Sequence, residues 1–191
     1  MVRSMGDAIL GLDVSTSVVG VSIVDPTVEP VDGAHIKLLD RIEFKGCTTF
    51  WSKADAVQAY LVQLRAAYPD TIGRVAVEEP LMGFRPGMSS AQTITTLMRF
   101  NGIVSYLARG VFLCEPEYVG SAHARKLCGI KLQRTAVGGP QKEQVFAHMS
   151  QNDLRHVSWP TKRSGRIVDW SRDACDAYVI ARAAALAGSN G

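Results

Sequence analysis

The pattern of apolar and polar residues predicts three strands in the first part of the chain. Apolar residues dominate residues 8–15, a run that holds Asp13 near its end, and they dominate residues 18–25 as well. The link over residues 15–17 is so short that these two strands are expected to form a hairpin. After a segment rich in Pro, Asp and Gly, residues 36–44 alternate well enough for a third strand.

Helices and short strands alternate in the rest of the chain. Apolar residues recur at spacings of three and four over residues 52–67, which predicts a helix with Ser52 as its N-cap. Residues 75–77 predict a buried strand, which stops before Pro80. The further elements expected are a helix over 91–108, a fifth strand over 111–114, short helices over 121–126 and 141–150, loops over 131–139 and 151–168, and an alanine-rich helix over 169–187.

This order of elements indicates an α/β fold. An antiparallel opening followed by helical crossovers predicts a mixed five-stranded sheet with helices on both faces. Neither an internal repeat nor a second core is evident, so residues 1–187 are expected to form a single domain. Residues 188–191 are expected to be a flexible tail, because Gly188 suits the end of a helix.

Composition narrows the functional classes. The 191 residues are 47% hydrophobic and 20% charged, as in ordinary soluble proteins, and the net charge of +3 permits a nucleic-acid partner without requiring one. The four cysteines lack zinc-site spacing, and no apolar run approaches the roughly 20 residues of a membrane span. We therefore expect no membrane partner and a cytoplasmic location, in a bacterium or the host cell of a virus, with an organellar matrix as the alternative.

Four acidic residues are candidates for a metal site. Asp13 and Glu78 each stand near the end of a predicted strand, and Asp173 and Asp176 share one face of the last helix. Several buried carboxylates need cations to neutralise them, and oxygen ligands suit Mg²⁺ or Mn²⁺. Each acid taken alone is also compatible with a structural role, because strand ends and first helical turns commonly carry aspartate.

Three segments resemble the motifs of the RuvC-type Holliday junction resolvases. They are residues 9–17 (ILGLDVSTS), 75–79 (VAVEE) and 173–181 (DACDAYVIA), in the family's order and with its rough spacing. The resemblance extends from residue 9 to about residue 185 and implies an RNase H-like fold. It also implies that two Mg²⁺ ions, for which Mn²⁺ can substitute, are held by four catalytic carboxylates: Asp13, Glu78, Asp173 and Asp176. Neighbouring side chains alternate along a strand, so Glu79 is expected to point away from the metals, but the break at Pro80 leaves its part in the site open.

The same resemblance implies an activity and partners. It implies a DNA endonuclease that resolves four-way junctions by two-metal-ion phosphodiester hydrolysis, in recombination and repair, and that works as a homodimer through the helix containing residues 96–107. Lys126 and Lys142 occupy positions similar to the family's DNA-contacting lysines. Phe84 stands a little beyond the position of the family's junction-wedging aromatic residue. The loops over 131–139 and 155–166 look longer than usual, which leaves the selectivity for junctions open.

Basic residues just before the last helix suggest further contacts with DNA. Lys162, Arg163 and Arg166 are placed to hold phosphates, and a solvated loop is the alternative. Three other functions stay open: an RNase H-type nuclease acting on RNA–DNA hybrids, a catalytically inactive DNA-binding module, and an actin/hexokinase-type nucleotide-binding protein. The last has a similar strand–Asp–hydroxyl hairpin, but 191 residues are too few for its two lobes.

Overall fold

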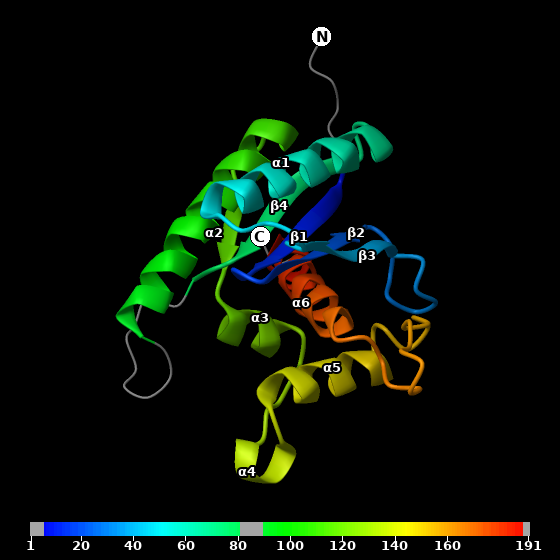
Figure 1. The fold of residues 1–191 in the computed structure, drawn as a ribbon. Coiled ribbons are helices and arrows are strands. Elements are labelled where there is room, and N and C mark those ends of the chain that lie inside the picture. The colour runs from blue at the N-terminus through cyan, green and yellow to red at the C-terminus, as the bar shows by residue number, and fades with distance from the viewer. Residues whose placement is uncertain (1–5, 81–89, 189–191) are drawn as a thin grey trace.

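The computed structural model describes residues 6–80 and 90–188. A five-stranded sheet lies at its centre (Figure 1). The strand order is β3-β2-β1-β4-β5. β1 pairs antiparallel with β2 and β2 with β3, whereas β4 runs parallel to both β1 and β5. The mixed sheet and the β1–β2 hairpin are therefore confirmed. The strands are β1 (Ala8–Val14), β2 (Val18–Val24), β3 (Ile36–Glu43), β4 (Ile72–Glu78) and β5 (Glu117–Val119).

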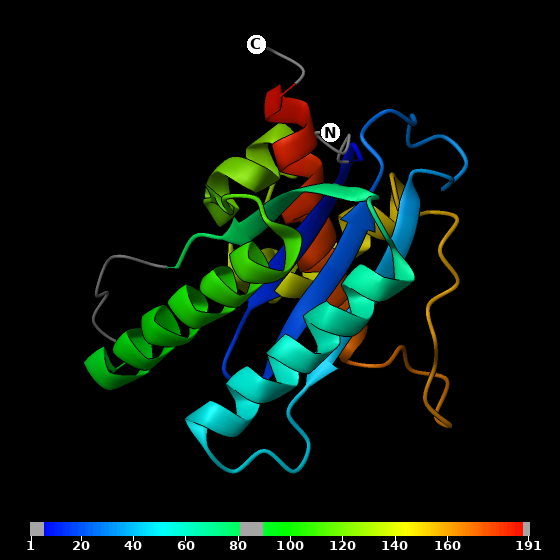
Figure 2. The same cartoon turned by 90° about the horizontal axis from the view of Figure 1, so that it is seen from above.

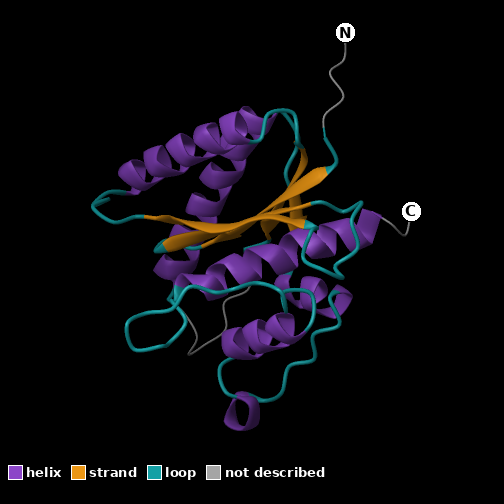
Figure 3. Ribbon diagram, turned by 90° about the vertical axis from the view of Figure 1, so that its right-hand side faces the viewer, coloured by secondary structure: helices purple, strands orange, loops and turns teal. Residues whose placement is uncertain are grey.

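Helices cover both faces of this sheet, as Figure 3 shows edge-on. On one face α1 (Phe50–Ala67) and α2 (Ala91–Phe112) pack side by side, as the view from above also shows (Figure 2). On the other face α6 (Trp170–Gly188) lies along the strands. Three shorter helices complete that side: α3 (Ser121–Leu127), α4 (Thr135–Gly138) and α5 (Gln141–Gln151).

Alternation along the strands divides the core into two layers. Leu10 and Leu12 of β1 face α1 and α2, whereas Ile9 faces α6. Because side chains alternate, Gly11 and Asp13 must share the side of Ile9 and point toward α6. The sequence pattern of β1 thus turns one carboxylate toward the helix that carries two more.

α6 packs very close to the sheet because small residues meet at the contact. A Cβ atom at Gly11 or Gly20 would overlap the backbone carbonyl oxygens of Ala177 and Asp173, respectively. Gly20 also lies directly opposite Asp13 in the β1–β2 ladder. The glycines therefore let the backbone of α6 approach the strands and bring the start of this helix beside Asp13.

The fifth strand was predicted in the wrong place. Residues 111–114 are not a strand, because α2 continues through Phe112 and ends at Leu113, which adopts a left-handed conformation with φ of 59°. Val104, Ala108 and Phe112 are all buried at a spacing of four, so the apolar run completes a helical face. The fifth strand is Glu117–Val119 instead.

Several element boundaries also differ from the prediction. Ser52 is not the N-cap of α1: Thr49 is, and its hydroxyl accepts from the Ser52 amide while Ser52 Oγ accepts from the Thr49 amide, a capping box. The loop predicted over 131–139 contains the short helix α4. α6 begins at Trp170 and includes Gly188, which is therefore not its cap.

Some expectations fall outside the described residues. Phe84 lies in the segment 81–89, and the end of the predicted tail lies in 189–191, neither of which the structure describes. Within residues 6–80 and 90–188, no helix is both long enough and apolar enough to span a membrane.

Candidate active site

The four predicted carboxylates gather at one end of the sheet, where β1 and β4 finish. Asp13 is next to the last residue of β1, and Glu78 is the last residue of β4. These strands are parallel neighbours with Leu12 opposite Val77, so Asp13 and Glu78 end side by side. Asp173 and Asp176 occupy the first turns of α6, which crosses this same end of the sheet. Residues separated by more than 160 positions thus form one acidic cluster.

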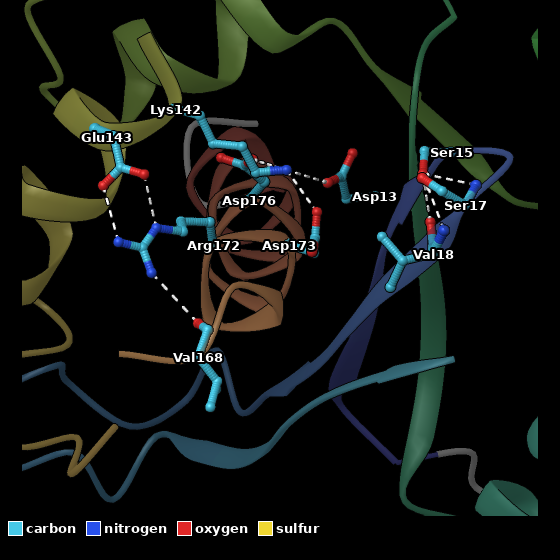
Figure 4. Close-up of polar contacts among 10 residues, drawn as sticks. All are labelled: Asp13, Ser15, Ser17, Val18, Lys142, Glu143, Val168, Arg172, Asp173 and Asp176. Carbon is cyan, nitrogen blue, oxygen red and sulfur yellow. Dashed lines mark hydrogen bonds and ion pairs between the residues drawn. The ribbon is translucent and has the colours of Figure 1, made fainter. Parts of the chain in front are cut away.

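The ammonium group of Lys142 lies inside this cluster (Figure 4). Lys142 is near the start of α5, and its Nζ atom is 2.5 Å from Asp173 Oδ1 and 3.3 Å from Asp176 Oδ2. The same atom is 4.0 Å from Asp13 Oδ2. The ammonium of one lysine therefore contacts one carboxylate from β1 and two carboxylates from the first part of α6.

The negative charge of this cluster is only partly offset by Lys142. Burial, followed by the negative charge of neighbouring Glu78, raises the pKa of Asp13 well above its usual range. Burial also raises the pKa of Asp176 to about 6, even though Lys142 acts in the opposite direction. Desolvation alone would lower the pKa of Lys142, but its hydrogen bond to Asp173 and the nearby carboxylates outweigh this and raise it. A single ammonium does not fully neutralise the cluster.

The donor chemistry of the cluster fits divalent cations such as Mg²⁺ and Mn²⁺. All of its ligand atoms are carboxylate oxygens, which are hard donors, and they come from rigid strands and a helix. As the side chains stand, residues 6–80 and 90–188 contain no group of three Asp, Glu, His or Cys side chains arranged to hold an ion. The ligand types suit a metal, while the present arrangement is adapted to Lys142.

Two further contacts hold the elements of the site in place. Arg172 of α6 donates two hydrogen bonds to Glu143 of α5, at 2.8 and 3.0 Å, which joins the first turns of these helices beside Lys142 (Figure 4). On the other side of the sheet, the amide of buried Asn101 donates to the backbone carbonyl of Glu78 at 2.9 Å. Neither the pair nor Asn101 was identified from the sequence, because no motif marks a contact between distant helices.

In the hairpin after Asp13, the hydroxyl of Ser15 forms hydrogen bonds within the turn. Ser15 Oγ donates to the carbonyl of Val18 at 2.7 Å and accepts from the amides of Ser17 and Val18 (Figure 4). The ammonium of Lys53 donates to the carbonyl of Thr16. The hydrogen bonds of Ser15 make it a turn-forming residue of the hairpin.

Of the basic residues predicted to contact DNA, Lys142 lies within the acidic cluster and Arg166 lies beside it. Arg166 lines an open hollow of about 460 Å³ together with Lys142 and Asp173. Lys162 forms an ion pair with Asp169 at 2.7 Å, and Arg163 is exposed on the same loop. Lys126 lines a separate hollow on α3 and does not join the acidic cluster.

Arg125 and Gln141 are site residues that the sequence analysis missed. With Ser121, they line a pocket of about 200 Å³ whose wall also includes Glu78 and Asp176. Apolar residues of α3, α5 and α6 form its floor: Ala124, Val145, Val179 and Ile180. The available signal was proximity in sequence, since Arg125 precedes Lys126 and Gln141 precedes Lys142.

Comparison with solved structures finds the same fold in RuvC. The chain is similar to "T. thermophilus RuvC in complex with Holliday junction substrate", with a TM-score of 0.66 and 14% identity over 96% of each chain. A second Thermus thermophilus RuvC structure matches with a TM-score of 0.59 and 16% identity, again over 96% of each chain. No family model matches the sequence, and comparison with curated proteins finds no match. The RNase H-like fold that the three motifs indicated is thus confirmed.

Proposed function

We propose that this protein is a metal-dependent DNA endonuclease that resolves four-way junctions. The observation that carries the proposal is the convergence of Asp13, Glu78, Asp173 and Asp176 at one edge of a sheet with the fold of RuvC. One of the similar structures holds a Holliday junction substrate, which supports branched DNA as the substrate class. Fold alone does not specify function, so the proposal depends on the site.

The four carboxylates are the residues that would hold Mg²⁺. Two ions bound to such oxygens supply an activated water and neutralise the charge that develops on the leaving oxygen. Asp13 and Glu78 contribute from adjacent strand ends, and Asp173 and Asp176 contribute from α6. The desolvation of Asp13 and Asp176 favours this role, because under-solvated carboxylates gain most from a bound cation.

Basic side chains around the cluster would hold the DNA backbone. Arg166 borders the hollow beside Asp173, and Arg125 borders the pocket beside Glu78 and Asp176. Guanidinium groups on both sides of the acids allow a phosphodiester to approach carboxylates that would otherwise repel it. Lys126, Lys162 and Arg163 lie farther out and would contact neighbouring phosphates.

We propose further that two copies associate through the exposed ridge of α2. Met98, Gly102 and Tyr106 are spaced by four residues on this helix, and all three are exposed. Tyr106 is 71% exposed, and a Cβ atom at Gly102 would meet no atom within 4 Å. An aromatic side chain beside an open glycine suits close approach of a second helix, and a two-fold dimer would match the symmetry of a junction.

The proposal is tested by cleavage of labelled DNA. Four-way junction, linear duplex, flap and RNA–DNA hybrid are incubated with Mg²⁺ and wild-type protein, Asp13→Asn or Asp176→Asn. Paired symmetric nicks in the junction, absent with both variants, are the expected result. Cleavage of the hybrid alone would replace the proposal with an RNase H-type activity. No cleavage of any substrate with Mg²⁺ or Mn²⁺ would overturn the nuclease assignment and make nucleotide binding the next assay.

A further inference from the structure

Lys142 occupies the space in which a metal ion would contact the same oxygens. Its Nζ atom is 2.5 Å from Asp173 and 3.3 Å from Asp176, and 4.0 Å from Asp13. Metal–oxygen distances for Mg²⁺ are about 2.1 Å, and paired ions lie about 3.5–4 Å apart. An ammonium that contacts three of the four acids would therefore compete with divalent ions for the same oxygens.

The surroundings of Lys142 provide space for its side chain to leave. Lys142 lines both the pocket of about 200 Å³ beside Glu78 and the hollow of about 460 Å³ beside Arg166. Its side chain is 43% exposed, so the ammonium can turn toward solvent or a DNA phosphate without unpacking the core. The helix itself stays in place, because the Arg172–Glu143 pair and the buried side chains of Val145 and Phe146 fix α5.

We propose that Lys142 is a built-in counter-ion that competes with divalent metal for the acidic cluster. In the metal-free protein its ammonium offsets the repulsion among Asp13, Asp173 and Asp176 and holds their side chains together. Metal binding displaces this ammonium, which then faces the approaching DNA. The inference rests on the proposed function in taking the cluster to be a metal site, and it adds that the protein weakens its own metal affinity.

The competition is measured by calorimetric titration of Mn²⁺ into protein freed of metal with EDTA. Lys142→Met removes the competing charge and keeps most of the side-chain volume, so we expect its Kd for Mn²⁺ to be about tenfold lower than that of the wild type. Lys142→Gln serves as a second variant if Lys142→Met does not fold. Adding Asp13→Asn to either protein should abolish the heat, which assigns the binding to this cluster.

Lys126→Met is the matched control, because it removes the same charge from the neighbouring helix α3, outside the cluster. Its Kd should equal that of the wild type. A Lys142 variant that binds Mn²⁺ no more tightly than the wild type would overturn the proposal, and so would equal tightening in Lys126→Met. Tighter Mn²⁺ binding by Lys142→Met, together with no junction cleavage by the wild type, would instead overturn the nuclease function and leave this inference standing.

Discussion

Gly20 of β2 lies directly beneath the backbone carbonyl of Asp173, at a distance that leaves no room for a Cβ atom. Because Gly20 is also the partner of Asp13 in the β1–β2 ladder, this one contact sets the spacing between two of the four carboxylates. The absence of a side chain at residue 20 is therefore a requirement of the acidic cluster as well as of the packing.

We predict that Gly20→Ala destabilises the protein and displaces α6. The added methyl group must push Asp173 outward, and overpacking of this kind costs roughly 1–3 kcal/mol in the free energy of unfolding. Gly110→Ala is the control, since a Cβ atom there meets nothing within 4 Å and alanine favours a helix by up to about 1 kcal/mol. Urea denaturation measures both changes. Equal stability of the two variants would contradict the close contact.

We predict that Glu78 and Glu79 differ sharply in function although they are adjacent. Glu78→Gln should lower Mg²⁺-dependent cleavage by at least roughly 10²–10³-fold, since it removes a charged ligand at the reacting centre. The carboxylate of Glu79 instead lies near Gly120, and its amide donates to Val119. Glu79→Gln should therefore retain nearly full activity in the same assay. Strong loss of activity in Glu79→Gln would place this residue in the metal site.

Glu78→Gln should also raise the Tm of the protein in EDTA. Burial is the largest cause of the raised pKa of Asp13, and the negative charge of Glu78 raises it further. The two carboxylates therefore repel each other in the folded protein. Glu79→Gln should leave the Tm near that of the wild type, so this pair of variants separates the two positions without any DNA.

We predict that buried His35 makes the protein less stable in mild acid. His35 is fully buried, and its Nε2 atom hydrogen-bonds the hydroxyl of Tyr178 at 2.8 Å. Burial lowers its pKa below the ordinary 6.5, despite the opposing charge of Asp153. The depressed pKa means that this contribution to stability is present above about pH 6.5 and is lost as the pH falls through the folded-state pKa.

His35→Gln should flatten that pH dependence, because glutamine has no proton to gain. Urea denaturation of both proteins at about pH 7.5 and about pH 5.5, a range in which histidine titrates, measures the difference. The wild type should lose more stability between the two conditions than the variant does. Parallel losses would show that other groups carry the effect.

We predict that Tyr106→Glu separates the proposed dimer into monomers. A carboxylate on the exposed ridge of α2 would be buried without a partner in the dimer, at a cost of several kcal/mol. Sedimentation of the wild type should give twice the mass of one chain. Sedimentation of the variant should give the mass of one chain. Val137→Glu changes an equally exposed residue on α4 and should remain dimeric. A monomeric wild type would refute the proposed interface.

The sequence located the carboxylates well because their positions follow from local patterns. Asp13 and Glu78 each come at the end of a short apolar strand, and in parallel neighbours such ends meet at one edge. The spacing of Asp173 and Asp176 places both on one side of a helix. The hairpin, the mixed sheet and the covering of both faces likewise followed from the order and lengths of the apolar runs.

Other features depend on tertiary contacts that no local pattern encodes. The apolar run over 111–114 suits a short strand and a helix end equally well, and burial of Phe112 in the core, on the same face of α2 as Val104 and Ala108, decides for the helix. Lys142 was expected to contact DNA, but its place among the acids depends on how α5 docks on α6 through Arg172 and Glu143. Such docking joins segments whose relation becomes apparent only in the folded chain.

The acidic cluster combines the first strand with the last helix, and this has a consequence for synthesis on the ribosome. While the segment of α6 is still inside the exit tunnel, the emerging chain carries Asp13 and Glu78 but lacks Asp173 and Asp176. Domains tend to complete folding only when their last elements have emerged. A nascent chain would thus lack the proposed activity until α6 has emerged, and a product terminated before α6 would never acquire it.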